Sequence, residues 1–259
     1  GTSAGGARAK AVIAWNPETH EIRSGQFDVP EGFEHWLLKF DGMGPDSELG
    51  ITEDFGRIEY AYYLMARAAG IEMSPSRLFT ENGRAHFMTK RFDRDGNLKH
   101  HVQTLCAMEH LDYKQRATHG YAQAFMAIAA LGIGQDGLDE LFRRMVLNVV
   151  CRNHDDHTKN CSFILKQDQD WALAPAYDVT HAYNPHGEWT SQHLMHVNGK
   201  FTGITRQDLT AEASRFGIRR ADEIIARVLD VARDFRRYAK EAGLPEEKAA
   251  LISRDFCWI

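Results

Sequence analysis

One short polar segment of the sequence carries the residue types and the spacing that phosphoryl transfer needs. Residues 152–160 read RNHDDHTKN, and Asp155 and Asn160 within them are five positions apart. In protein kinases this Asp-x-x-x-x-Asn spacing places a carboxylate beside the attacking hydroxyl and an amide oxygen on Mg²⁺. Asp178 follows eighteen residues after Asn160. Because Mg²⁺ takes one or two carboxylates beside the nucleotide phosphates, the pattern indicates a Mg²⁺-dependent phosphotransferase.

Two other interpretations of this segment remain open from the residues alone. A polar loop of nine residues is often no more than a solvated, capped turn. A zinc site is the second alternative, since four potential ligands follow one another at spacings of three, three and four, namely Cys151, His154, His157 and Cys161. The spacing is not that of a usual zinc finger, and we rank zinc below phosphoryl transfer.

A lysine and a glutamate upstream extend the phosphotransferase pattern. Lys39 lies near the end of an apolar run, and Glu59 lies about one-third of the way along the helix expected next. A lysine at a strand end usually faces solvent, but in kinases one such lysine binds the nucleotide phosphates and pairs with a helix carboxylate. Lys39, Glu59, Asp155, Asn160 and Asp178 occur in the order of these kinase parts.

The elements that must position these residues change in kind along the chain. The first ninety residues read mainly as strand, with one helix over 54–69 that Gly70 ends; the strands are expected at Lys10–Trp15, Trp36–Phe40 and Arg84–Phe92. Later apolar residues recur every three to four positions, which predicts helices over 138–150 and 225–239. A hairpin of 162–165 with 171–173 interrupts them. We therefore expect an α+β, two-lobed protein-kinase-like fold, with residues 1–93 as N-lobe and 94–259 as C-lobe.

Composition excludes several classes of protein. The 259 residues carry a net charge of −5, so bulk basic charge for gripping nucleic acid is absent. No apolar stretch is long enough to span a membrane, and we expect no membrane partner. Four scattered cysteines are too few for a disulfide scaffold, which favours a reducing cytoplasm.

The motifs together resemble the HipA family, the kinase toxins of bacterial toxin–antitoxin modules. The resemblance covers essentially the whole chain and rests on the segments Ser3-Ala4-Gly5-Gly6-Ala7-x-x-Lys10, Trp36-Leu37-Leu38-Lys39-Phe40, Lys90-Arg91-Phe92-Asp93-Arg94, Asn153-x-Asp155-x-His157-x-Lys159-Asn160 and Leu173-Ala174-Pro175-x-Tyr177-Asp178. It implies a Mg²⁺-ATP-dependent protein serine/threonine kinase. It also implies a helix-turn-helix antitoxin as partner, DNA contact only through that antitoxin, and a protein substrate such as an aminoacyl-tRNA synthetase.

The resemblance also implies a role for each matching residue. Asp155 resembles the catalytic base, Asn160 and Asp178 the Mg²⁺ ligands, and Ser3 the serine that the family phosphorylates on itself. The remaining positions resemble nucleotide contacts: Gly5, Gly6, Lys39, Glu59, Lys90, Phe92, Gln103 and His157.

Longer family members carry an N-terminal subdomain before the glycine cluster, whereas this sequence begins at that cluster. Two other functions remain alternatives. One is a small-molecule phosphotransferase of the antibiotic-kinase type, and the other is a catalytically silent member that binds nucleotide or antitoxin.

Overall fold

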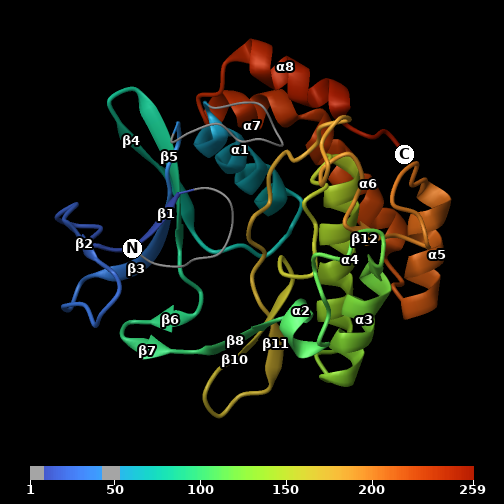
Figure 1. Ribbon diagram of the computed structural model, residues 1–259, viewed down its shortest axis with the longest axis horizontal. Coiled ribbons are helices and arrows are strands. Elements are labelled where there is room, and N and C mark those ends of the chain that lie inside the picture. Colours follow the sequence, from blue (N-terminus) through green and yellow to red (C-terminus); the bar gives the residue numbers. More distant parts are fainter. Residues whose placement is uncertain (1–8, 43–52) are drawn as a thin grey trace.

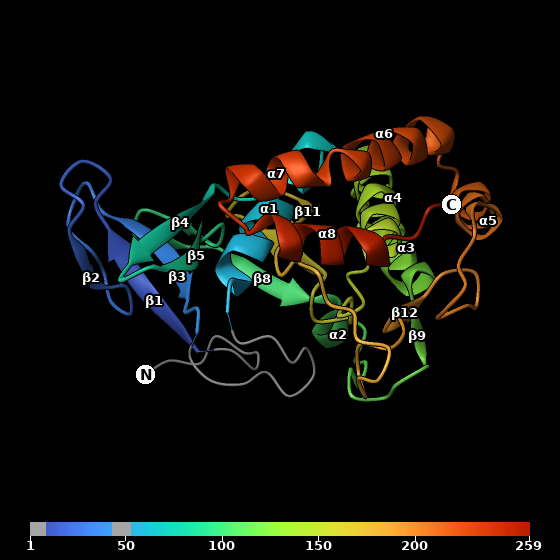
Figure 2. The same cartoon turned by 90° about the horizontal axis from the view of Figure 1, so that it is seen from above.

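A five-stranded sheet forms one end of the molecule and a group of helices forms the other (Figures 1 and 2). The computed structural model describes residues 9–42 and 53–259. All neighbouring strands of the sheet are antiparallel, in the order β2-β1-β3-β5-β4. Their bounds are β1 Lys10–Trp15, β2 Ile22–Ser24, β3 Glu34–Lys39, β4 Ser76–Glu81 and β5 Arg84–Lys90.

The three strands expected from the sequence are confirmed as β1, β3 and β5, with ends that differ by up to two residues. The third expected strand, for example, ends at Lys90 and not at Phe92. β3 is the central strand of the sheet, and Lys39 at its end lies opposite Lys10 of β1 and Phe87 of β5. The lysine is therefore not at a sheet edge, which argues against the solvent-facing interpretation.

Helix α1, Phe55–Ala68, packs on β5 at the end of the sheet where Lys39 lies. Asp41 accepts hydrogen bonds from the main-chain N–H groups of Asp54 and Phe55, at 3.1 and 2.9 Å, and so caps the helix. Gly56 lies so close to β5 that a Cβ atom there would be 1.9 Å from the Ala85 carbonyl oxygen. Only glycine allows this approach of helix to strand.

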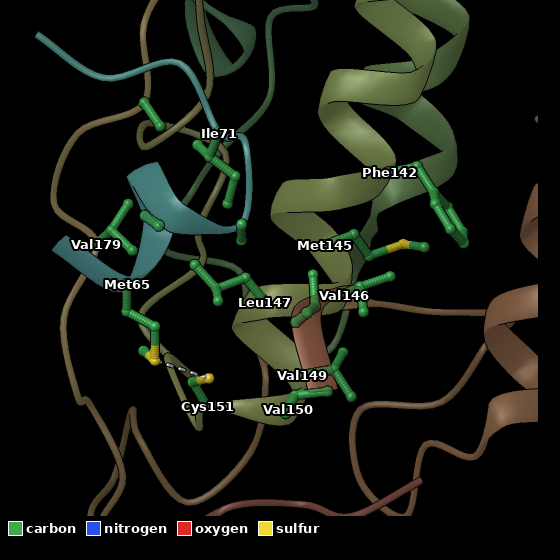
Figure 3. Close-up of a cluster of buried hydrophobic side chains, with 14 of the residues drawn as sticks. Met65, Ile71, Phe142, Met145, Val146, Leu147, Val149, Val150, Cys151 and Val179 are labelled. Atoms are coloured by element: carbon green, nitrogen blue, oxygen red, sulfur yellow. Dashed lines mark hydrogen bonds between the residues drawn. The ribbon is translucent and has the colours of Figure 1, made fainter. Parts of the chain in front are cut away.

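Helix α4, Gln135–Val150, is the centre of the helical end, as its apolar periodicity predicts. Its buried side chains meet those of α1 in one continuous core, shown in Figure 3 around Met65, Met145 and Val149. The helices that pack against it are α3 Tyr121–Ala130, α5 Arg206–Phe216 and α6 Ala221–Arg233. Helix α7 Phe235–Glu241 packs on α1, and α8 Glu246–Asp255 packs on α7. None of the described helices is both long enough and apolar enough to cross a membrane.

The prediction of a single helix over 225–239 is wrong, because the chain forms two helices there, α6 and α7, in succession. At the break, the Asp234 N–H bonds to the Val231 carbonyl three residues back, so the α-helical hydrogen-bond pattern is interrupted at this one residue. The apolar residues on both sides stay buried. Their spacing therefore continues through a bend that the sequence pattern does not reveal.

A second, smaller sheet adjoins the polar residues 152–160. β10 Ser162–Leu165 pairs with β11 Trp171–Leu173, as expected, and also with β8 His101–Thr104, which was not expected. The polar residues 152–160 connect α4 to β10. The short elements are α2 Leu105–Met108, β6 Arg94–Asp95, β7 Leu98–Lys99, β9 His119–Gly120 and β12 Met195–His196. The lobe boundary between residues 93 and 94 stays a prediction.

Candidate active site

The Lys39 ammonium is the point at which three distant parts of the chain meet. Its Nζ atom donates to Glu59 Oε1 of α1 at 2.5 Å and to Asp178 Oδ1 of the segment after β11. Lys39 is 8% exposed and Glu59 is 3% exposed. A charge this buried is stable only when it is paired, and both partners here are carboxylates.

The pairing shifts the pKa values of Lys39 and Asp178 in opposite directions. Burial acts to lower the Lys39 pKa, but the carboxylates of Asp178 and Glu59 raise it above its ordinary value. For Asp178, burial acts to raise the pKa, but the Lys39 ammonium and then Lys10 lower it to about 2. Asp178 is therefore an anion at neutral pH and can act as a metal ligand.

A cavity of about 410 Å³ opens beside these residues. Lys39, Glu59 and Asp178 line it together with the predicted contacts Lys90 and Phe92. Its size lies within the range of small-molecule sites. Apolar and polar side chains also line it, among them Val12, Leu37, Met73, Phe87, Val102, Thr104 and Tyr177.

Residues 90–92, which include the predicted nucleotide contacts Lys90 and Phe92, form part of the wall of the large cavity. The Lys90 N–H donates to the Pro75 carbonyl and the Arg91 N–H donates to the His35 carbonyl, both at 2.9 Å. These two N–H groups are therefore engaged within the protein. The Lys90 side chain also turns to Glu34, with 2.5 Å between Nζ and Oε1.

Asp155 and Asn160 lie in the loop between α4 and β10. The Asp155 side chain is 48% exposed, and its Oδ1 atom is 3.6 Å from His157 Nε2. Asn160 Nδ2 donates to the Asp155 main-chain carbonyl at 2.8 Å. This bond fixes the amide so that its oxygen points away from that carbonyl, and the oxygen is the atom that a cation would use.

Asn160 and Asp178 share a second, small cavity of about 40 Å³, which His157 also lines. A deprotonated carboxylate and an amide oxygen at one cavity are hard oxygen ligands of the type that Mg²⁺ prefers. The residues present thus fit a Mg²⁺ ion beside the larger cavity.

Asp156 anchors the loop to the rest of the helical end, and this role was not predicted from the sequence. It is 2% exposed and accepts hydrogen bonds from the Tyr121 hydroxyl, from the ring of His193 and from the Leu194 N–H, at 2.8, 2.8 and 2.7 Å. Adjacent aspartates therefore face opposite ways, with Asp155 outward and Asp156 inward. The sequence gives no local sign of which is which, because the partners of Asp156 lie 35 or more residues away.

The start of the loop is tied to the C-terminal segment. Arg152 Nε donates to the Asp255 carbonyl at 2.7 Å, and the Cys257 N–H donates to the Val150 carbonyl at 2.8 Å. Arg152 itself has a positive φ of 57°. These contacts hold the chain where it leaves α4 and turns into the loop.

Two predicted nucleotide contacts do not line the large cavity, and two more lie outside the described residues, as does the predicted phosphorylation site. Gln103 lies in β8 between Val102 and Thr104, which line the large cavity, but does not line it itself. His157 lines the small cavity only. Gly5, Gly6 and Ser3 lie outside the described residues.

Two of the four residues of the zinc alternative, Cys151 and His154, are engaged with separate neighbours. Cys151 Sγ contacts Met65 Sδ at 3.9 Å in the core (Figure 3), and the ring of His154 bonds to the Thr190 carbonyl at 3.0 Å. Burial raises the thiol pKa of Cys151 and raises that of Cys161 to about 11, so both stay protonated. In the described part of the chain, no three histidine, cysteine or acidic side chains are grouped as metal ligands would be.

Comparison with known proteins identifies the family of this sequence. The sequence matches the protein family described as "HipA-like C-terminal domain" over residues 2–255. No curated protein sequence matches the chain significantly.

Among solved structures, the chain is similar to HipA of the Shewanella oneidensis MR-1 toxin–antitoxin system, determined with HipB and its operator DNA. The TM-score is 0.70 at 16% identity, over 98% of this chain and 62% of that chain. This likeness confirms the expected fold, and the chain spans less than two-thirds of that HipA chain. The Helicobacter pylori proinflammatory kinase CtkA also matches, with a TM-score of 0.49 at 10% identity over 86% of this chain and 91% of that one. Since the family match extends over nearly every residue, the chain belongs to the HipA-like C-terminal domain family.

Proposed function

We propose that the chain is a Mg²⁺-ATP-dependent protein serine/threonine kinase of the HipA toxin type. The observation that carries the proposal is the buried contact of Lys39 with both Glu59 and Asp178 at the wall of a cavity of about 410 Å³. A lysine held in this way between two carboxylates presents a fixed positive charge to nucleotide phosphates. The HipA-family membership supports the same function.

In this proposal, each residue of the site has one task. Asp155, half-exposed at the loop, orients the acceptor hydroxyl and accepts its proton. Lys39 binds the phosphates, and Asn160 with Asp178 would hold Mg²⁺, which neutralises charge on the triphosphate when it is bound. Most of the rate enhancement then comes from positioning and from charge neutralisation.

The nucleotide base would lie at the other end of the large cavity, against Phe92 and residues 90–92. Gly5 and Gly6 would cover the phosphates, and Ser3 would be the site of autophosphorylation. Gln103 and His157 do not line the large cavity, so their predicted contact with a nucleotide would require the nucleotide to extend beyond it or these side chains to move.

The HipA structure with HipB and operator DNA supports a partner for this chain as well. We propose that a helix-turn-helix antitoxin binds it and that DNA contact occurs only through that antitoxin. A component of translation, such as an aminoacyl-tRNA synthetase, is the proposed protein substrate.

Two variants test the chemistry because they should fail in different ways. Asp155→Ala removes the base and should leave Mg²⁺-ATP binding nearly intact, while Asp178→Ala removes a metal ligand and should weaken binding as well. Calorimetric titration with Mg²⁺-ATP and a radiolabel assay on whole-cell protein measure the two steps. If both variants bind Mg²⁺-ATP like the wild type, Asp178 does not bind the metal.

The same label offered to a panel of metabolites distinguishes protein from small-molecule acceptors. Label that appears on metabolites and not on protein would favour the antibiotic-kinase alternative. Binding without transfer to either class would favour a catalytically silent member.

A further inference from the structure

Tyr177 lies where three parts of the site meet. It directly precedes Asp178, it lines both the large and the small cavity, and its ring stacks on Phe92 with 6.0 Å between the centroids. The stacking on Phe92 is a contact of the ring. The phenol hydroxyl makes hydrogen bonds of its own.

The hydroxyl connects the segment before Asp178 to the catalytic loop. It donates to the Lys159 main-chain carbonyl at 2.6 Å, and Lys159 directly precedes Asn160. The phenol oxygen is also in hydrogen-bond contact with Ser162 Oγ. A phenol has one hydrogen and a carbonyl can only accept, so the Tyr177 hydrogen points to Lys159 and Ser162 must be the donor in the other contact.

This fixes the direction of a short chain of hydrogen bonds, from Ser162 through Tyr177 to the Lys159 carbonyl. Ser162 is 2% exposed, so the start of the chain is protected from water. Burial raises the pKa of the Tyr177 phenol above its ordinary value. The hydroxyl therefore keeps its proton at neutral pH and remains a donor there.

We infer that Tyr177 is a positioning residue whose hydroxyl fixes the separation of Asn160 and Asp178, the two proposed Mg²⁺ ligands. Each ligand is one residue from an end of the hydrogen bond, since Lys159 precedes Asn160 and Tyr177 precedes Asp178. With the hydroxyl gone, the loop and the Asp178 segment could move apart independently. This inference rests on the proposed function, because it assumes that the two residues share a metal ion.

Tyr177→Phe tests the inference because it keeps the ring and removes only the hydroxyl. We expect the Mg²⁺ concentration for half-maximal ATP binding to rise about three- to tenfold, the range set by the loss of one hydrogen bond. Affinity for ATP without Mg²⁺ should stay unchanged, because the ring still meets Phe92. Calorimetric ATP titrations at a series of Mg²⁺ concentrations measure both quantities.

A second measurement needs neither nucleotide nor metal. Amide hydrogen exchange across residues 157–161 of the Mg²⁺-free protein should be faster in Tyr177→Phe than in the wild type, because the Lys159 carbonyl has lost its donor. Ser162→Ala serves if Tyr177→Phe does not fold. It should shift the Mg²⁺ dependence in the same direction and by less, since the phenol is still present.

Tyr62→Phe is the matched control. Tyr62 is also buried, and its hydroxyl donates to a main-chain carbonyl, that of Cys151, at 2.5 Å. Its loss should lower the unfolding temperature without changing the Mg²⁺ dependence. A shift of the same size in both variants, or no shift in Tyr177→Phe, would overturn the inference alone. A wild-type chain that binds no ATP at any Mg²⁺ concentration would instead overturn the proposed function, and with it this inference.

Discussion

Replacing Gly56 by alanine tests whether the close approach of α1 to β5 holds Lys39 and Glu59 together. The new Cβ would lie 1.9 Å from the Ala85 carbonyl oxygen and 3.0 Å from the Ala85 carbonyl carbon. The obstacle is main chain of a paired strand, so it cannot rotate away as a side chain would. The helix itself must move.

The distances give the size of the effect. A contact of at least 3.0 Å requires α1 to retreat by more than 1 Å at Gly56. The Lys39–Glu59 contact of 2.5 Å, lengthened by the same 1.1 Å, would become about 3.6 Å, which is outside hydrogen-bond range. Overpacking of this kind costs about 1–3 kcal/mol, which lowers the unfolding temperature of a chain of this size by roughly 2–12 °C.

Thermal unfolding followed by circular dichroism measures the stability of the variant, and calorimetric titration measures its ATP affinity. We expect both to fall, because the displaced Glu59 no longer pairs with Lys39. Gly137→Ala is the control: Gly137 also lies in the first turn of a helix, α4, but its Cβ would meet the Ile133 side-chain methyl at 2.5 Å. This obstacle is a side chain, which can shift where the main chain of a paired strand cannot, so stability should fall by less than in Gly56→Ala. A Gly56→Ala protein that unfolds and binds ATP like the wild type would refute this account of how α1 is placed.

Four further predictions concern the charges of the site and the phosphorylation of Ser3. Lys39→Met should lower stability by about 3–5 kcal/mol in urea unfolding, because Glu59 is left as an unpaired buried charge. Lys39→Arg should not support ATP binding, since a planar guanidinium does not replace a compact ammonium. Full ATP binding by Lys39→Arg would contradict a specific role of the lysine at the phosphates. The Asp178 pKa of about 2 lies below the value of about 3.9 in an unfolded chain, so its contribution to stability is present above pH 3.9 and is lost as the pH falls through 2. The stability difference between wild type and Asp178→Asn should therefore shrink between pH 4 and pH 2, and a constant difference would contradict the Lys39 pairing. Mass spectrometry should find phosphate on Ser3 in the wild type and not in Asp155→Ala, and equal occupancy in both would exclude autophosphorylation there.

The sequence predicts well those elements whose pattern is local. The strand Lys10–Trp15 and the hairpin of 162–165 with 171–173 were located to the residue, because each is a short apolar run between turn residues. The break at Asp234 was missed because a one-residue bend leaves the apolar spacing almost unchanged. β8 was missed since its partner, β10, lies more than fifty residues later.

The residues of the site also fall into two groups, those that the sequence predicts and those that it does not. The residues that meet around the cavity, Lys39, Glu59 and Asp178, could be predicted because their types and order match a known pattern. The residues that position them could not. Asp41 caps a helix thirteen residues later, and Asp156 depends on Tyr121 and a segment near His193, so their partners are determined by the fold and not by neighbours in sequence.

The hydrogen bond between Arg152 and the Asp255 carbonyl has a consequence for the time at which the loop of residues 152–160 becomes fixed during synthesis. The ribosome makes the chain from the N-terminus, and the sheet with α1 can begin to fold first. The loop of residues 152–160 follows α4. The carbonyl that bonds to Arg152 and the N–H that bonds to Val150 belong to Asp255 and Cys257, about one hundred residues later. A nascent chain that already contains Asp155, Asn160 and Asp178 still lacks these two anchors. The loop would thus become fixed only after Asp255 and Cys257 have left the ribosome, well after the residues of the loop itself.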